Sequence, residues 1–82
     1  MAHYFFHFRD GRSLLRDGEG RDFASVARMR MAALADARSM IADDALHGNV
    51  HLEPSIEVED AGGAPVYSLA FADAVTVTGG RG

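Results

Sequence analysis

The stretch His3-Tyr4-Phe5-Phe6-His7-Phe8-Arg9-Asp10-Gly11 decides the fold of this chain. An aromatic-rich run that ends at an Asp-Gly turn is typical of a β-strand. Side chains alternate along a strand, so Tyr4, Phe6 and Phe8 face one way while Phe5 and His7 face the other. Large side chains on both faces indicate that both faces of the sheet are covered. In a chain of 82 residues, we expect the second cover to be another molecule.

A short second strand follows the first turn. It comprises Ser13 to Arg16, and the turn signal Asp17-Gly18-Glu19-Gly20 breaks the chain again. The stretch up to residue 20 is therefore predicted to be a hairpin with a turn after it.

The hydrophobic period changes to that of a helix after Asp22. We expect the Asp22 carboxylate to cap this helix and His47-Gly48-Asn49 to end it. At 100° per residue, one stripe of the helix collects the apolar side chains. Its members are Phe23, Val26, Ala27, Ala33, Leu34, Ala37, Met40 and Ile41.

A second hairpin is predicted after the helix. Ile56 to Glu59 alternates apolar and acidic residues, turn residues occupy 60–65, and 66–71 is the return strand. Residues 75–78 are expected to form a short final edge strand. The fold class is α+β in the order β-β-α-β-β, with a four-stranded antiparallel sheet and one long helix packed on one face. Residues 1–78 are expected to form a single domain, and 79–82 a flexible tail.

The composition restricts the function classes. The chain has no cysteine, no apolar run of the ~20 residues that span a bilayer and no signal-peptide layout, which predicts a cytoplasmic protein without membrane association. Residues 1–38 carry seven arginines and five acids, a net +2, whereas 39–82 carry one arginine and seven acids, a net −6. This overall acidic charge disfavours nucleic acid as a partner.

The sheet face away from the helix is the candidate interface. A domain of this size buries only about 60% of its unfolded surface, so association is a plausible supplement to its stability. We therefore predict a homodimer, with an unidentified protein as an alternative partner. The candidate interface residues are Phe5, His7, Arg9, Arg30, Glu57, Glu59, Ser68 and Ala70.

Arg30 falls near the centre of the apolar helix stripe. A charge there either extends past its neighbours to water or pairs with a carboxylate. Glu57, Glu59 and a second subunit are the candidate sources of that carboxylate.

No group of residues predicts an enzyme, a cofactor or a metal site. His3 and His7 share a strand face but lie roughly 13 Å apart, too far to bind one ion. Glu57 and Glu59 are spaced like an acid–base pair, yet Glu alternating with apolar residues is far more often a solvated strand face.

The opening motif, Asp17-Gly18-Glu19-Gly20, the Ala/Arg-rich helix and Ile56-Glu57-Val58-Glu59-Asp60 with Leu69-Ala70-Phe71 resemble a known family. It is the small bacterial domain-of-unknown-function family numbered 6894. The resemblance implies a stand-alone bacterial domain of this size and brings no activity or site residue. A looser similarity links the strand pair and helix to HicB-like antitoxins, although the chain lacks their third strand before the helix and a DNA-binding segment.

These observations favour a non-enzymatic protein-interaction or regulatory module. An antitoxin-like protein that covers a toxin or a nucleic-acid-processing enzyme is the first alternative. A small-ligand or metal-binding domain that uses His7 is the second.

Overall fold

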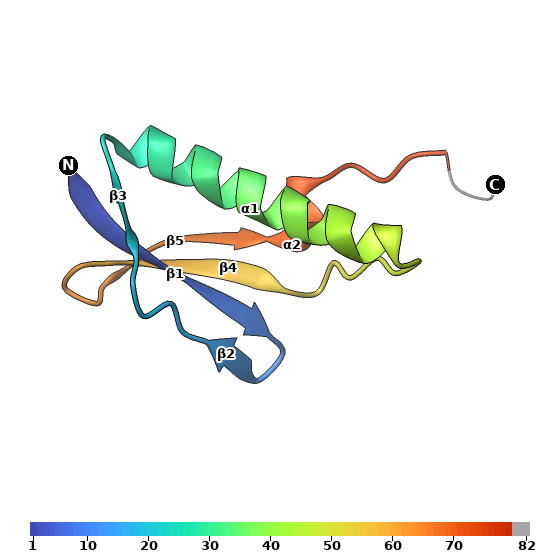
Figure 1. The fold of residues 1–82 in the computed structure, drawn as a ribbon, viewed down its shortest axis with the longest axis horizontal. Helices are drawn as coiled ribbons and strands as arrows, with labels where there is room; N and C mark the ends of the chain where they lie inside the picture. Colours follow the sequence, from blue (N-terminus) through green and yellow to red (C-terminus); the bar gives the residue numbers. More distant parts are fainter. Residues whose placement is uncertain (80–82) are drawn as a thin grey trace.

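The computed structural model describes residues 1–79 of the chain. Five strands and two helices follow one another along the sequence (Figure 1). They are β1 (Ala2–Asp10), β2 (Ser13–Leu15), β3 (Arg21–Phe23), α1 (Val26–Leu46), β4 (Ser55–Asp60), β5 (Pro65–Ala70) and α2 (Phe71–Ala74).

The strands form one antiparallel sheet in the order β2-β1-β4-β5, and β3 pairs with β1 as well. The aromatic strand β1 is central, with Phe6 opposite Val58 of β4. The α+β class with one long helix is confirmed, but the sheet has five strands rather than four. The prediction missed β3, in which Asp22 pairs with His3 of β1.

Two short strands share the same edge of β1. β2 pairs with its last residues, Phe8 to Asp10, and β3 pairs with its first, Ala2 to Tyr4. Residues 16–20 connect the two and pass beside the middle of β1. This arrangement positions the polar cluster described below.

Helix α1 runs along one face of the sheet (Figure 1). Its first turn is capped by Ser25, whose Oγ accepts the Arg28 N–H at 3.1 Å. The prediction of an Asp22 cap is wrong, because Asp22 is already part of β3. Gly48, at φ 86°, takes the left-handed conformation just beyond the C-terminal end of the helix.

The helix contacts the sheet along one line of residues. Met29, Ala33, Ala37 and Ile41 are buried and lie four residues apart, so they follow one another on the same side of α1. The alanines let the helix approach the sheet closely. Val26 and Met40 of the predicted stripe are instead exposed, at 49% and 39% of their surface.

Aromatic rings fill the space between the layers. Phe6 of β1 stacks on Phe23 of β3 with centroids 5.6 Å apart, and Phe8 meets the edge of Phe71 at 5.8 Å. Phe71 is 2% exposed. Tyr4, Phe6 and Phe8 thus face the helix as their alternation predicts.

Residues 71–79, which follow β5, do not return to the sheet. Phe71 and Ala74 of α2 are buried in the core, and Arg38 of α1 donates its Nε–H to the Ala74 carbonyl at 2.8 Å. The predicted strand at 75–78 is wrong, because this short helix turns the chain toward α1 (Figure 1). Of the predicted tail, only Gly79 is among the described residues. Within residues 1–79, neither helix combines the length and the apolar character needed to cross a membrane.

Candidate interaction surface

The sheet face away from α1, here called the far face, carries seven of the eight predicted interface residues. Cross-strand partners share a face, and the registers pair Phe5 with Glu59, His7 with Glu57 and Glu57 with Ser68. The far face thus comprises Phe5, His7, Arg9, Glu57, Glu59, Ser68 and Ala70. The eighth residue, Arg30, lies on the helix side.

His7 is the most buried polar side chain of this face, with 3% of its surface exposed. Its Nδ1 accepts the Asp17 N–H at 3.0 Å, so the ring proton of the neutral form lies on Nε2. Nε2 donates to Glu59 Oε1 at 3.1 Å. Both ring nitrogens are therefore occupied within the chain.

Two charged pairs lie beside His7 on the far face. Arg9 Nε lies 3.0 Å from Glu57 Oε2, and Arg16 reaches Glu59 at 3.3 Å. Phe5 lies half-buried among them. The second cover of β1 is thus supplied in part by residues 16–20 of the chain itself, whereas the sequence predicted another molecule.

Asp17 closes the middle of the β1 edge. Its Oδ2 accepts the Phe6 N–H at 3.0 Å, in the gap that neither β2 nor β3 fills. Its Oδ1 accepts the N–H groups of Glu19 and Gly20, each at 3.0 Å. Partial burial raises the pKa of this carboxyl, but the bonds from Gly20, Phe6 and Glu19 outweigh it, so the pKa is lowered.

His3 anchors the same connection further along. Its Nδ1 lies 2.7 Å from Asp22 Oδ1, and its Nε2 lies 2.8 Å from the Glu19 carbonyl. Both partners are acceptors, so both ring nitrogens must donate, which requires the protonated imidazolium. The Asp22 bond, and after it the Glu19 bond, raises the pKa of His3 above its ordinary value of 6.5.

The predicted ion pair between Arg30 and Glu57 or Glu59 is wrong. Both carboxylates project from the far face, whereas Arg30 belongs to the helix on the opposite side. Arg30 is exposed, and its guanidinium lies 5.1 Å from the centroid of the Tyr67 ring of β5. It therefore covers an aromatic ring and stays in contact with water.

Strand β5 forms the other edge of the sheet, and its outer side has no backbone partner within residues 1–79. Residues 61–72 contain no charged side chain. Val66, in this strand, is 42% exposed. A hollow of about 440 Å³ lies beside the strand, lined by Glu57, Val58, Glu59, Pro65, Tyr67 and Ser68.

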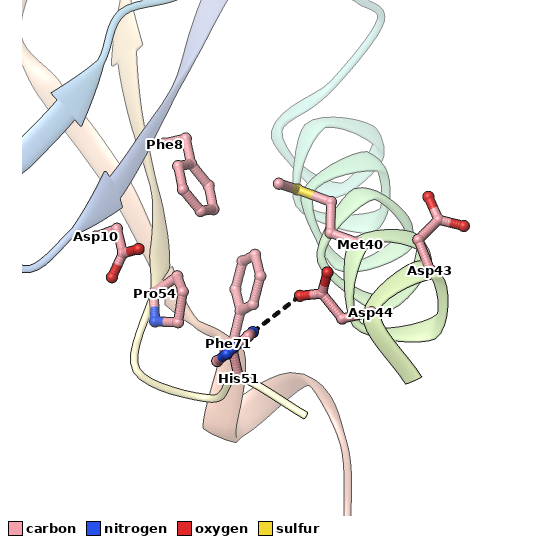
Figure 2. A pocket seen from close by; sticks show the side chains of 8 residues that line it. All are labelled: Phe8, Asp10, Met40, Asp43, Asp44, His51, Pro54 and Phe71. Atoms are coloured by element: carbon pink, nitrogen blue, oxygen red, sulfur yellow. Dashed lines mark hydrogen bonds and ion pairs between the residues drawn. The ribbon is translucent and has the colours of Figure 1, made fainter. Parts of the chain in front are cut away.

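A second hollow, of about 360 Å³, lies between the C-terminal half of α1 and the end of β1 (Figure 2). Phe8, Phe71 and Pro54 line one side, and Met40 faces them from the helix. Asp10, Asp43 and Asp44 add carboxylates, and His51 pairs with Asp44 at 3.3 Å. Residues 1–79 contain no group of three His, Cys, Asp or Glu residues able to hold a metal ion.

Comparison with known proteins places the chain in a family. The model of a domain of unknown function, DUF6894, matches residues 3–72. The chain belongs to the DUF6894 family. The matched DUF6894 segment begins in β1 and ends in α2, so it includes the β1 edge, its Asp17 closure and the whole of β5. No curated protein and no solved structure matches the chain, so the looser similarity to HicB-like antitoxins gains no support.

The sequence pattern predicts only a turn at Asp17. Asp17 also joins this turn to the opening strand, because its carboxylate accepts the Phe6 N–H and its backbone N–H donates to His7 Nδ1. The sequence does contain a signal for this role. The second strand is too short to pair with the whole of β1, and the Asp-Gly-Glu-Gly turn follows it directly.

Proposed function

We propose that this DUF6894 chain is a non-enzymatic protein-interaction module that acts as a homodimer in the bacterial cytoplasm. The contact that we propose is the open edge of the sheet at β5. Ser68 and Ala70, two of the predicted interface residues, belong to this strand.

The observation that carries the proposal is the difference between the two edges of the sheet. The β1 edge is closed by β2, by β3 and, between them, by the Asp17 carboxylate on the Phe6 N–H. The β5 edge has no such cover in the described residues and no charged side chain. Proteins usually protect exposed edge strands with charges or a covering segment, so an edge without them favours strand pairing between molecules.

The charges of the far face argue against placing the dimer contact there. Arg9, Arg16, Glu57 and Glu59 already pair within the chain. Burying these pairs under a second sheet would cost desolvation that their mutual attraction offsets only in part. An edge contact leaves them in water.

Light scattering on a size-exclusion column tests the proposal. We expect a mass of twice the 8.8 kDa of the chain at two loading concentrations that differ tenfold. Asp17→Asn provides a control, because it alters the closed edge and leaves β5 intact. A mass of 8.8 kDa at both concentrations would refute the homodimer.

A further inference from the structure

The hydrogen bonds of β5 identify which backbone groups are free at the open edge. Opposite residues in an antiparallel pair alternate between pairs that exchange hydrogen bonds and pairs that do not. The N–H of Phe71, the residue after β5, donates to the Pro54 carbonyl at 2.9 Å, so the bonded positions on β5 itself are Leu69 and Tyr67. The N–H and C=O groups of Ser68 and Ala70 consequently point away from β4.

The beginning of β5 is less available. Val58 pairs with Tyr67 and Glu59 pairs with Pro65, so Val66 is an extra residue that forms a bulge. Pro65 has no N–H to donate, and bulges and prolines both limit pairing at an edge. New pairing is therefore centred on the second half of the strand.

We propose that β5 pairs antiparallel with β5 of a second copy, with the Ser68 residues of the two chains opposite one another on a two-fold axis. In this register each Ser68 exchanges both backbone bonds with its counterpart. Val66 then lies opposite Ala70 of the second copy, and Tyr67 lies opposite its Leu69. A register centred on Leu69 would place Tyr67 opposite Phe71, which already belongs to α2. Only residues 68–70 could then pair, so the Ser68 register gives the longer overlap.

The side chains of β5 suit a second copy better than a foreign strand. A two-fold contact must be self-complementary. Read in either direction from Ser68, the strand presents first a large side chain, Tyr67 or Leu69, and then a smaller apolar one, Val66 or Ala70. No charge lies within residues 61–72, so self-pairing brings no like charges together.

The inference rests on the proposed homodimer and specifies its surface, and a single engineered cysteine tests it. The chain has no cysteine of its own, so Ser68→Cys carries one thiol. Bonded antiparallel partners have Cα atoms about 5.5 Å apart, within the ~4.4–6.8 Å that a disulfide spans. Ser39→Cys is the matched control, because Ser39 is also exposed but lies on α1.

Under mild oxidation, we expect Ser68→Cys to form a covalent dimer at least about tenfold faster than Ser39→Cys, since paired thiols react at an effective concentration in the mM range. Equal rates, together with a wild-type mass of twice 8.8 kDa, would overturn the β5 pairing and leave the homodimer standing. A monomeric wild type would overturn the proposed function itself.

Ala70→Pro provides a second test that does not depend on a disulfide. Ala70 has φ −72°, which suits proline, and its N–H does not bond to β4. The variant should therefore keep its far-ultraviolet circular dichroism and lose an edge donor. We expect its dimer dissociation constant to rise at least about tenfold, and an unchanged constant would contradict the pairing.

Discussion

At the scale of single residues, two side chains hold the connection that closes the β1 edge. His3 binds Asp22 and the Glu19 carbonyl as an imidazolium. Asp17 collects the N–H groups of Phe6, Glu19 and Gly20. Their pKa values move in opposite directions, which gives each a distinct pH signature.

The contribution of His3 to stability should decrease as the pH rises. Its pKa is raised in the folded chain, so the contribution is complete below 6.5 and is lost as the pH rises through the folded-state pKa. A nuclear magnetic resonance titration of its ring should give a midpoint above 6.5. In Asp22→Asn this midpoint should fall, because the variant removes the Asp22 carboxylate, whose hydrogen bond is the largest cause of the raised pKa. A wild-type midpoint at or below 6.5 would show that the ring is not held as an imidazolium.

Asp17→Ala should destabilise the fold by about 2–3 kcal/mol, because it leaves the Phe6 N–H at mid-sheet without an acceptor. Urea denaturation at pH 7 measures the change. The pKa of Asp17 is lowered, so its contribution is present above 3.8 and is lost as the pH falls through the lower folded-state value. The difference in free energy of unfolding between the wild type and Asp17→Ala should therefore become smaller as the pH falls through that value. A deficit under about 0.5 kcal/mol would contradict the closing role.

Gly20→Ala should cost at least about 2 kcal/mol, because it combines backbone strain with a steric clash. Gly20 has φ +72°, and a Cβ there would lie 2.5 Å from His3 Nε2 and 2.8 Å from the Tyr4 carbonyl oxygen. Gly18→Ala is the matched control, since a Cβ at Gly18 has nothing within 4 Å. In thermal unfolding, Gly20→Ala should have a lower melting temperature than Gly18→Ala. Equal melting temperatures would contradict the predicted strain and clash at Gly20.

At the scale of elements, the long patterned segments could be predicted and the short ones could not. The 3.6-residue period identified the helix, and the alternation along β1, β4 and β5 assigned seven interface residues to one face. β3 has three residues and no period of its own, so it pairs with β1 only because the connection returns there. Residues 75–78 form no strand, because α2, with Phe71 and Ala74 buried in the core, directs the chain away from the sheet just before them.

Substitution of two serines tests whether Ser25 caps the start of α1. Ser25→Ala should cost about 1 kcal/mol, the usual value for loss of a side-chain acceptor at an N-cap. Ser39→Ala, on the exposed side of the same helix, should be neutral or slightly stabilising. Urea denaturation of both variants compares them. A larger loss in Ser39→Ala than in Ser25→Ala would contradict the assignment.

At the scale of the whole molecule, the chain covers one sheet face with α1 and one sheet edge with its own loop. The other edge, at β5, has no backbone partner among residues 1–79. The sequence predicted association from size and from two-sided aromatics, but it placed the contact on the far face. Charge pairing between strands 48 residues apart in the sequence, such as that of Arg9 with Glu57, is not visible before the register is known.

The central claim is that the chain closes one edge itself and leaves the other to a second copy. Amide hydrogen exchange, followed by nuclear magnetic resonance at two protein concentrations, tests both halves together. The Phe6 amide should be protected equally at both concentrations, because Asp17 of the same chain binds it. The Ser68 and Ala70 amides should be protected at the high concentration and exchange faster on dilution below the dimer dissociation constant. Rapid exchange of Ser68 and Ala70 at a concentration where the protein is dimeric would contradict the account.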